Sequence, residues 1–263
     1  MSYTPLANIL KKNLRNLRKF IIRDYNEIEE LQSSVKDTKL FIKKSQKKIE
    51  DEVVSLLTKI KPNFQIVKNI ENNIQDFWMI NIIDSFLNFK RANDNFGINI
   101  SLFEKNIIQT NLFYNPIKDD IFYYEKVTGA FKNETRIRVS NIKKKEESVV
   151  SVFNNKRDSS LSYEGLIKKN LSENYFSTFE SGSCYSDLSN LSCGKIDCCI
   201  IINPANNVVQ EASIIVNSTG GNSKIIELKD SKIFIAGNKF VDRMVIEMVE
   251  KFLNKWIILL KNH

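Results

Sequence analysis

The stretch from Trp78 to Phe89 constrains this chain more than any other. It reads Trp-Met-Ile-Asn-Ile-Ile-Asp-Ser-Phe-Leu-Asn-Phe. Its first six residues are almost all apolar, as in a buried strand. Two polar side chains, Asp84 and Ser85, follow directly. In many α/β enzymes the chemistry lies at the carboxyl ends of such strands, so we expect a functional loop at this point.

The composition is that of an ordinary globular protein. The chain has 263 residues, of which 42% are apolar and 27% are charged, enough for one sizeable core or two closely packed sub-domains. The net charge of +8 is compatible with an acidic partner such as RNA or anionic lipid. However, the basic residues are scattered rather than striped, and Lys, Asn, Ile and Phe are all frequent, which favours a compositional bias.

The cysteines and the single histidine do not form a metal-binding motif. The four cysteines, Cys184, Cys193, Cys198 and Cys199, include no Cys-x-x-Cys pair, and the histidine is His263. We therefore expect free thiols and no zinc site. No apolar run is long enough to cross a bilayer, and no signal segment opens the chain. We expect a cytoplasmic protein without a membrane partner.

Hydrophobic periodicity predicts helices followed by strands in the first half. Apolar residues three and four apart mark two amphipathic helices, Pro5–Leu31 and Gln46–Lys61. The basic face of the first helix is either an interaction surface or a solvated face. Besides the stretch described above, segments rich in β-branched and aromatic residues predict five strands. They are Gln65–Val67, Phe96–Phe103, Ile107–Tyr114, Asp120–Tyr124 and Arg136–Val139.

In the second half, the pattern predicts strands that alternate with helices. The strands are Ser148–Phe153, Cys198–Ile202, Ser223–Leu228 and Lys232–Ala236. The helices are Tyr163–Lys169, one opened by Gly182-Ser183-Cys184, Val208–Asn217 and Lys239–Leu260. In the last helix, Met248 and Phe252 share the apolar face, so we interpret both as core residues.

Several motifs together resemble the inositol monophosphatase family and, within it, the bacterial SuhB type. Trp78, Asp84, Asn88 and Phe89 match the family signature Trp-Ile-x-Asp-Pro-x-Asp-Gly-Thr-x-Asn-Phe. Two turns and one long gapless segment also match: Tyr114–Pro116, Thr128–Asn133 and Gly182–Gly221. The resemblance implies an α/β fold of the α+β layered kind, the αβαβα sandwich of sugar phosphatases. It also implies one domain over residues 1–263, with an α+β half over about 1–145 and an α/β half over about 146–263.

The residues that differ from the family are those that perform its catalysis. Asn81 stands where the first metal-binding Asp belongs, and Phe86 replaces a Thr that helps to activate water. Other metal, water-orienting and substrate positions also lack the family's carboxylates. They carry Gln46, Asn69, Ile70, Ile201 and Val208. Asp84 is the only metal-binding carboxylate of the family that is retained.

These substitutions imply a family member that has lost catalysis, with no catalytic residues and no cofactor expected. Such a protein acts by binding a protein, RNA or a phosphorylated ligand. Family members are commonly homodimers, and some bacterial ones act in transcription by contacting RNA polymerase and antitermination factors. The resemblance therefore implies a homodimer with a transcription- or RNA-associated partner.

A small anion is a further candidate ligand. Asn69, Asn81, Asp84 and Ser85 are polar and have basic neighbours at Lys68, Lys90 and Arg91. An anion can bind such a site directly at a helix start, without a metal. A vestigial pocket is the other interpretation of the same residues.

The alternative function is a residual Mg²⁺-dependent phosphomonoesterase acting on inositol or sugar phosphates. Its metal would be held by Asp84, by Glu71 and by the main-chain carbonyl of Ile83. Glu71 is the nearest substitute carboxylate, but it lies two places beyond the family position. A shift of that size along an extended chain moves a side chain by several ångström.

Overall fold

A computed structural model describes residues 4–32, 39–69, 74–126, 128–155, 163–228 and 231–261. The chain divides into two compact units, Met1–Arg136 (unit 1) and Ile137–His263 (unit 2). That both units belong to one domain stays a prediction. Among the described residues, no helix combines the length and apolar character that are needed to span a bilayer.

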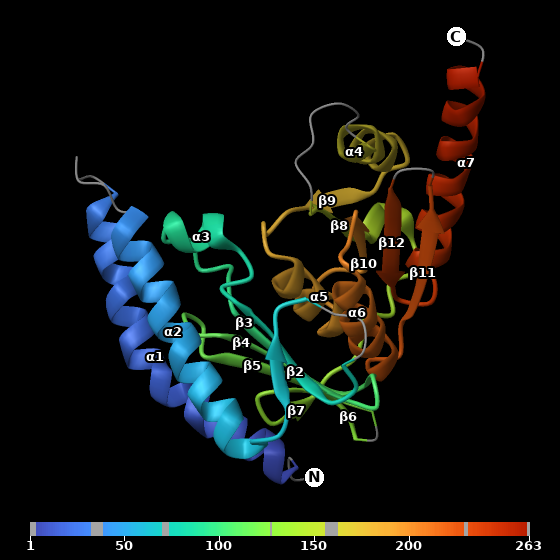
Figure 1. The fold of residues 1–263 in the computed structure, drawn as a ribbon. Helices are drawn as coiled ribbons and strands as arrows, with labels where there is room; N and C mark the ends of the chain where they lie inside the picture. Colours follow the sequence, from blue (N-terminus) through green and yellow to red (C-terminus); the bar gives the residue numbers. More distant parts are fainter. Residues whose placement is uncertain are drawn as a thin grey trace. The chain divides into compact units, whose positions relative to one another are not determined.

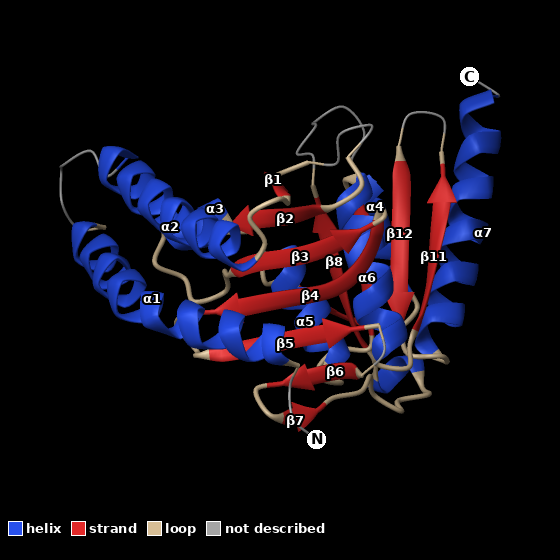
Figure 2. Cartoon of the chain, turned by 60° about the horizontal axis from the view of Figure 1, so that its bottom comes forward, coloured by secondary structure: helices blue, strands red, loops and turns tan. Residues whose placement is uncertain are grey.

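Unit 1 consists of two long helices, α1 and α2, that cover one face of a sheet (Figures 1 and 2). Its strands, seven within the described residues, follow one another across the sheet in sequence order. β1 is parallel to β2, and the other neighbours are antiparallel. The helices are α1 (Pro5–Leu31), α2 (Lys39–Ile60) and α3 (Phe86–Lys90). The strands are β1 (Gln65–Val67), β2 (Phe77–Ile82), β3 (Ile98–Glu104), β4 (Ile107–Asn115), β5 (Asp120–Glu125), β6 (Gly129–Lys132) and β7 (Thr135–Arg136).

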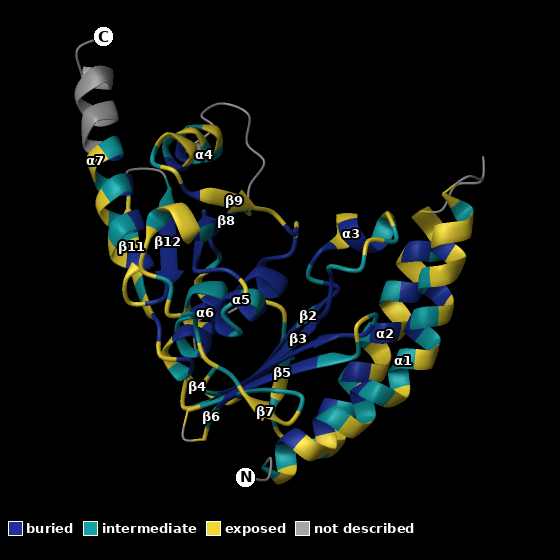
Figure 3. Cartoon of the chain, turned by 180° about the vertical axis from the view of Figure 1, so that it is seen from behind, coloured by how far each residue is buried: buried dark blue, intermediate teal, exposed yellow. Residues whose placement is uncertain are grey.

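Alternating burial explains this packing. The residues that α1 buries form a stripe along one side (Figure 3), as its period predicts. The apolar members of the stripe are Ala7, Leu10, Leu14, Ile21 and Ile28. On the sheet, every second residue faces the helices, among them Ile80, Ile100 and Leu112. The side chain of Thr4 caps α1 by accepting a hydrogen bond from the Ala7 N–H (3.3 Å).

Two predictions in unit 1 are wrong: the start of the second helix and the position of one strand. α2 begins at Lys39 rather than Gln46. Its buried face starts with Ile42 and Ser45, and the hydroxyl of Ser45 interrupts the apolar pattern that would have revealed the first turns. The predicted strand Arg136–Val139 is also wrong, because the chain pairs instead through β6 and β7, and β7 ends at Arg136.

Unit 2 is a sheet with helices on both faces. The strand order is β11-β12-β10-β8-β9, with β8 parallel to β9 and β10, and β12 antiparallel to β10 and β11. The strands are β8 (Val149–Asn154), β9 (Ser177–Phe179), β10 (Cys198–Ile202), β11 (Asn222–Glu227) and β12 (Lys232–Gly237). The helices are η1 (Lys145–Glu147), α4 (Tyr163–Glu173), α5 (Cys184–Ser192), α6 (Asn206–Ser218) and α7 (Val241–Lys261).

β10 lies in the middle of this sheet and is buried along its whole length. Ile200 packs with α4 and α7 through residues such as Ile167 and Val245. On the opposite face, Cys199 lies close enough to Asp187 of α5 for the two to interact electrostatically. The layered α/β fold predicted from the sequence is therefore confirmed within each unit.

Candidate functional site

The candidate site begins where β2 ends, in a loop over Ile83–Ser85 that we call the β2–α3 loop. β2 is an inner strand between β1 and β3, and Trp78, Ile80 and Ile82 anchor it against α1 and α2. Ile83 has a left-handed backbone (φ 61°), a conformation that costs a β-branched residue roughly 1–3 kcal/mol. The chain therefore turns sharply at the position where the sequence predicts a functional loop.

Asp84 fastens this loop to the start of β3. Its backbone N–H donates to the Gly97 carbonyl (3.1 Å), and the Gly97 N–H donates to Asp84 Oδ1 (2.8 Å). The two residues thus form a closed pair of hydrogen bonds across 13 positions of sequence. The carboxylate that the sequence singles out as a retained metal ligand has a structural role within unit 1.

Gly97 is required for this arrangement. A Cβ added to Gly97 would lie 2.3 Å from the ring of Phe113 and 2.6 Å from the main-chain oxygen of Tyr114. Real Cβ atoms do not approach other atoms so closely. The close approach of this backbone to β4 explains why the residue that exchanges hydrogen bonds with Asp84 is a glycine.

Ser85 and Asn88 hold the short helix α3 in place. Ser85 is the N-cap of α3, and its Oγ accepts a long hydrogen bond from the Asn88 N–H (3.4 Å). The Asn88 amide donates to the Asn95 carbonyl (2.5 Å). Phe89 is fully buried and packs edge-to-face on Phe96, with 5.1 Å between ring centroids. α3 has five residues, so its dipole contributes little to anion binding.

Phe86 and Leu87 give this loop an apolar surface. They are 43% and 48% exposed, respectively. In the family that the sequence resembles, the position of Phe86 carries a Thr that helps to activate water. A phenyl ring offers neither a hydrogen-bond acceptor nor a donor for that purpose.

Asn81 lies at the edge of a polar cluster that the sequence reasoning missed. Asn81 is paired with Asn99 in the β2–β3 register, on the sheet face that points away from α1 and α2. The Asn111 amide donates to Asn99 Oδ1 (2.7 Å) and to Ser101 Oγ (2.8 Å), and all three side chains are fully buried. Polar residues at alternate positions of otherwise apolar strands were the available signal.

Two other predicted positions reach the same end of the sheet. Gln46 lies on α2, and its amide donates to the Ile82 carbonyl over 3.5 Å. Asn69 follows β1, whose register sets Val67 opposite Met79, so Asn69 leaves the sheet near the level of Asn81. Asn69 is exposed, and the preceding Lys68 forms an ion pair with Glu50 (2.8 Å).

The predicted positions in unit 2 carry no carboxylate. Val208 lies in the first turn of α6 and is half-buried. Asn206, two residues earlier, accepts a hydrogen bond from Lys232 (2.5 Å). Ile201 is buried in β10.

The donors among the described residues do not by themselves fit a magnesium site. Mg²⁺ retains its waters unless several anionic oxygen ligands converge in near-octahedral geometry. At the β2–α3 loop and the adjoining end of β2, the described donors are the half-buried carboxylate of Asp84, the amide of Asn81, the hydroxyl of Ser85 and the carbonyl of Ile83. Among the described residues, no group of three or more His, Cys, Asp or Glu is placed to hold a metal. Ile70 and Glu71, the remaining candidates, lie outside the described residues.

The cysteines are free, as predicted. Cys198 and Cys199 are buried in β10, and this burial raises the pKa of both thiols well above the usual value. Thiols of this kind are poor nucleophiles.

The basic face of α1 contacts the β4–β5 turn of unit 1. Arg18 donates to the main-chain carbonyls of Pro116 (2.9 Å) and Ile117 (3.3 Å), in the β4–β5 turn. In the same way, Arg15 forms an ion pair with Asp119 (3.1 Å). These side chains therefore tie the helix to the sheet, an outcome that neither sequence interpretation included.

Comparison with known proteins gives a consistent result. A family model described as inositol monophosphatase family matches residues 3–228. The inositol-1-monophosphatase of Mesorhizobium japonicum is 22% identical over 267 residues, covering 97% of this chain and 99% of the relative. The Nus factor SuhB of Buchnera aphidicola subsp. Schizaphis graminum is 30% identical over 206 residues, covering 76% of each chain.

Solved structures show the same fold. The extragenic suppressor protein suhB of Bartonella henselae superimposes with a TM-score of 0.77 at 21% identity, covering 95% of this chain and 100% of that one. The Thermotoga maritima IMPase superimposes with a TM-score of 0.79 at 21% identity, covering 96% and 99% of the two chains. At this level of identity the likeness concerns the fold.

Proposed function

Because the chain belongs to the inositol monophosphatase family, we propose that it is a member without phosphatase activity that acts by binding. One observation carries the proposal. At the family's metal positions, Asp84 is the only carboxylate among the described residues, and its Oδ1 accepts the Gly97 N–H. This hydrogen bond gives Asp84 a role in the fold that does not require a metal.

The chemistry of phosphate ester hydrolysis supports this proposal. Bound metal ions neutralise the phosphate and lower the pKa of a water molecule, and carboxylates must hold them. An amide at Asn81 coordinates weakly, the aliphatic Val208 does not coordinate at all, and Phe86 cannot activate water. Metal binding and water activation are thus impaired together.

A phosphatase assay tests the proposal directly. The purified chain is incubated with Mg²⁺ and inositol 1-phosphate, next to Asp84→Asn and to Asp94→Asn, a half-buried carboxylate that pairs with Lys118 (3.3 Å). We expect all three to release phosphate at the uncatalysed rate. Mg²⁺-dependent release that Asp84→Asn abolishes and Asp94→Asn retains would instead establish the residual phosphomonoesterase, and Glu71→Gln would then test its second ligand.

The binding partner that we favour belongs to the transcription apparatus, because relatives that cover most of this chain carry the name Nus factor SuhB. Affinity purification of the tagged chain from its own cells, with quantitative mass spectrometry, is expected to enrich transcription proteins. Ribonuclease treatment separates a protein contact from one that RNA mediates. Enrichment of no transcription protein contradicts this partner. Sedimentation tests the expected homodimer.

A second candidate function is the direct binding of a phosphorylated ligand at Asn69, Asn81, Asp84 and Ser85. The half-buried amide of Asn81 beside a buried amide cluster favours it. Calorimetry with inositol 1-phosphate in chelator measures binding. Asn81→Asp adds a negative charge and is expected to abolish the heat, whereas Asn106→Asp in an exposed turn is expected to retain it. Absence of heat from the unsubstituted chain excludes this function.

A further inference from the structure

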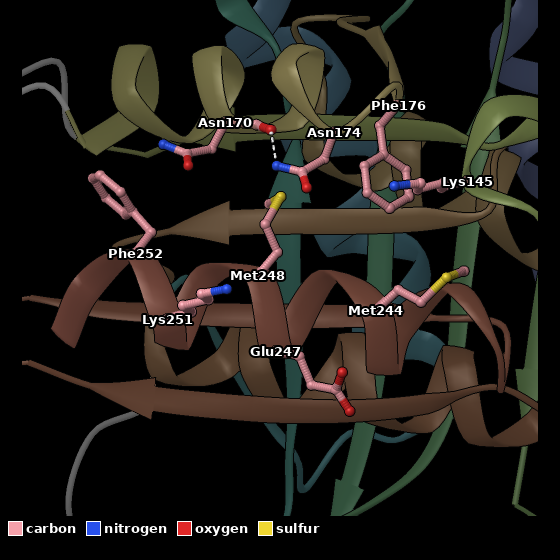
Figure 4. A pocket seen from close by; sticks show the side chains of 9 residues that line it. All are labelled: Lys145, Asn170, Asn174, Phe176, Met244, Glu247, Met248, Lys251 and Phe252. Carbon is pink, nitrogen blue, oxygen red and sulfur yellow. Dashed lines mark hydrogen bonds between the residues drawn. The ribbon is translucent and has the colours of Figure 1, made fainter. Parts of the chain in front are cut away.

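Unit 2 contains a groove between α4 and α7, which we call the α4–α7 groove (Figure 4). Its volume is about 530 Å³, within the range of sites that bind small organic molecules. The residues that line it come from η1, α4, the segment before β9 and α7. It therefore lies entirely within unit 2 and shares no residue with the β2–α3 loop.

The floor of the groove is apolar. Met244, Met248 and Phe252 recur every four residues along α7 and therefore lie on one face of it, and Phe176 lines the groove next to α4. The three α7 residues are half-buried and rest on the core of unit 2. Methionine side chains are flexible and polarisable, and they adapt to ligands of varied shape.

Two lysines supply positive charge at this apolar floor. Figure 4 shows Lys145 in front of the ring of Phe176 and Lys251 between Met248 and Phe252. The Lys145 nitrogen also lies 5.4 Å from the ring centroid of Tyr175. Among the described residues, neither lysine forms an ion pair with a carboxylate.

One carboxylate, that of Glu247, also lines the groove and offsets part of this charge. It lies on the side of α7 away from Asn170 and Asn174 (Figure 4). On the other wall, the amide nitrogens of Asn170 and Asn174 donate to main-chain carbonyls of α4, at 2.9 Å and 2.8 Å. The groove thus combines an apolar floor with two lysines and one carboxylate, which leaves a net positive charge.

We propose that the α4–α7 groove binds a small organic anion with an apolar body, such as an aromatic or medium-chain aliphatic carboxylate. The apolar body covers Met244, Met248 and Phe252, which are left partly exposed to water. The carboxylate forms a charge-assisted hydrogen bond with one of the two lysines, Lys145 or Lys251. A neutral molecule of the same shape gains the burial of apolar surface but not the charge-assisted hydrogen bonding.

Calorimetry with 1-naphthoate and its neutral isostere 1-naphthamide tests the proposal. We expect naphthoate to bind about tenfold more tightly than naphthamide, because of its charge-assisted contacts. In the double variant Lys145→Met/Lys251→Met, we expect naphthoate to bind no better than naphthamide. Lys169→Met is the matched control, since this exposed α4 lysine lies outside the groove and pairs with Glu173 (3.8 Å).

Met248→Glu places a negative charge on the floor and is expected to abolish binding of naphthoate while the protein retains its circular dichroism spectrum. Three results would overturn the proposal: no heat from naphthoate at millimolar concentration, equal affinity for the acid and the amide, or an unchanged affinity in the double lysine variant. None of these results depends on phosphatase activity or on a transcription partner, because the groove shares no residue with the β2–α3 loop.

Discussion

At the β2–α3 loop of unit 1, the retained polar side chains bond to the backbone of their own unit. Asp84 accepts from Gly97, and Asn88 donates to Asn95. At the α4–α7 groove of unit 2, Lys145 and Lys251 line the groove and form no ion pair with a carboxylate among the described residues. The comparison teaches that a retained motif residue can be hydrogen-bonded within the fold, while charged side chains outside the motif can lack an ion pair within the described part of the chain.

The largest expected effect on stability concerns Gly97, the glycine that is hydrogen-bonded to Asp84. Gly97→Ala forces a Cβ against Phe113 and the Tyr114 carbonyl, and we expect it to lower the free energy of unfolding by about 3 kcal/mol. Gly220→Ala is the control, because it has a positive φ but no atom within 4 Å and is expected to cost about 1 kcal/mol. Urea denaturation measures both. Equal costs would show that the approach of Gly97 to β4 is unimportant.

The next effect separates a structural from a metal-binding role of Asp84. Asp84→Ala removes the acceptor of the Gly97 N–H and is expected to cost about 2 kcal/mol of unfolding free energy. Asp84→Asn keeps an amide oxygen at the same position and is expected to cost less than about 1 kcal/mol. Urea denaturation without and with Mg²⁺ measures both variants. Stabilisation of the unsubstituted chain by Mg²⁺, lost in Asp84→Asn, contradicts the structural role.

A third prediction concerns pH, at the strand beside the loop. Burial, followed by a hydrogen bond to Asp119, raises the pKa of Tyr114. An unfolded tyrosine ionises near pH 10, whereas the folded one keeps its proton to higher pH. Stability is therefore fully present below about pH 10 and falls as the pH rises above it.

Tyr114→Phe is expected to make this alkaline loss less steep. Burial raises the pKa of Tyr123 in the same way, so part of the loss remains. At pH 7 the variant loses the hydrogen bond to Asp119 (3.0 Å), which we expect to cost about 1 kcal/mol. Thermal unfolding between pH 7 and 11 measures both effects. An unchanged slope above pH 10 contradicts the assignment.

The smallest expected effect lies in the groove. Because neither lysine is paired with a described carboxylate, Lys145→Met/Lys251→Met is expected to change the unfolding free energy by less than about 0.5 kcal/mol. Urea denaturation of this variant next to Lys169→Met provides the measurement. A loss above about 1 kcal/mol would mean that the two lysines serve the fold, and the contrast with the β2–α3 loop would disappear.

Most of the fold could be predicted from the sequence because its pattern is local. The strand Gln65–Val67 was predicted with its observed bounds, and the first helix likewise as Pro5–Leu31. The prediction failed where the polarity of a side chain did not match its degree of burial. Ser45 is buried on the apolar face of α2. Met248 and Phe252, interpreted as core, do pack against the core of unit 2, but they are only half-buried and also line the groove.

The candidate site could be located from the sequence but not described. The motif marked the loop after β2 and the absent carboxylates at Asn81 and Val208. It did not reveal that Asp84 bonds to Gly97, because that contact joins residues 13 positions apart. It also did not reveal the buried cluster of Asn99, Ser101 and Asn111, which depends on strand register.

The sequence by itself determined the family, the layered α/β fold and the kinds of side chain available at each position, since periodicity and motif spacing are properties of a single stretch. Only the tertiary structure decided which polar groups are already bonded and which are open. Hydrogen bonds and cavities arise between segments distant in sequence, and their geometry depends on register and packing. For that reason the sequence revealed neither the hydrogen bonds between Asp84 and Gly97 nor the groove that Lys145 and Lys251 line.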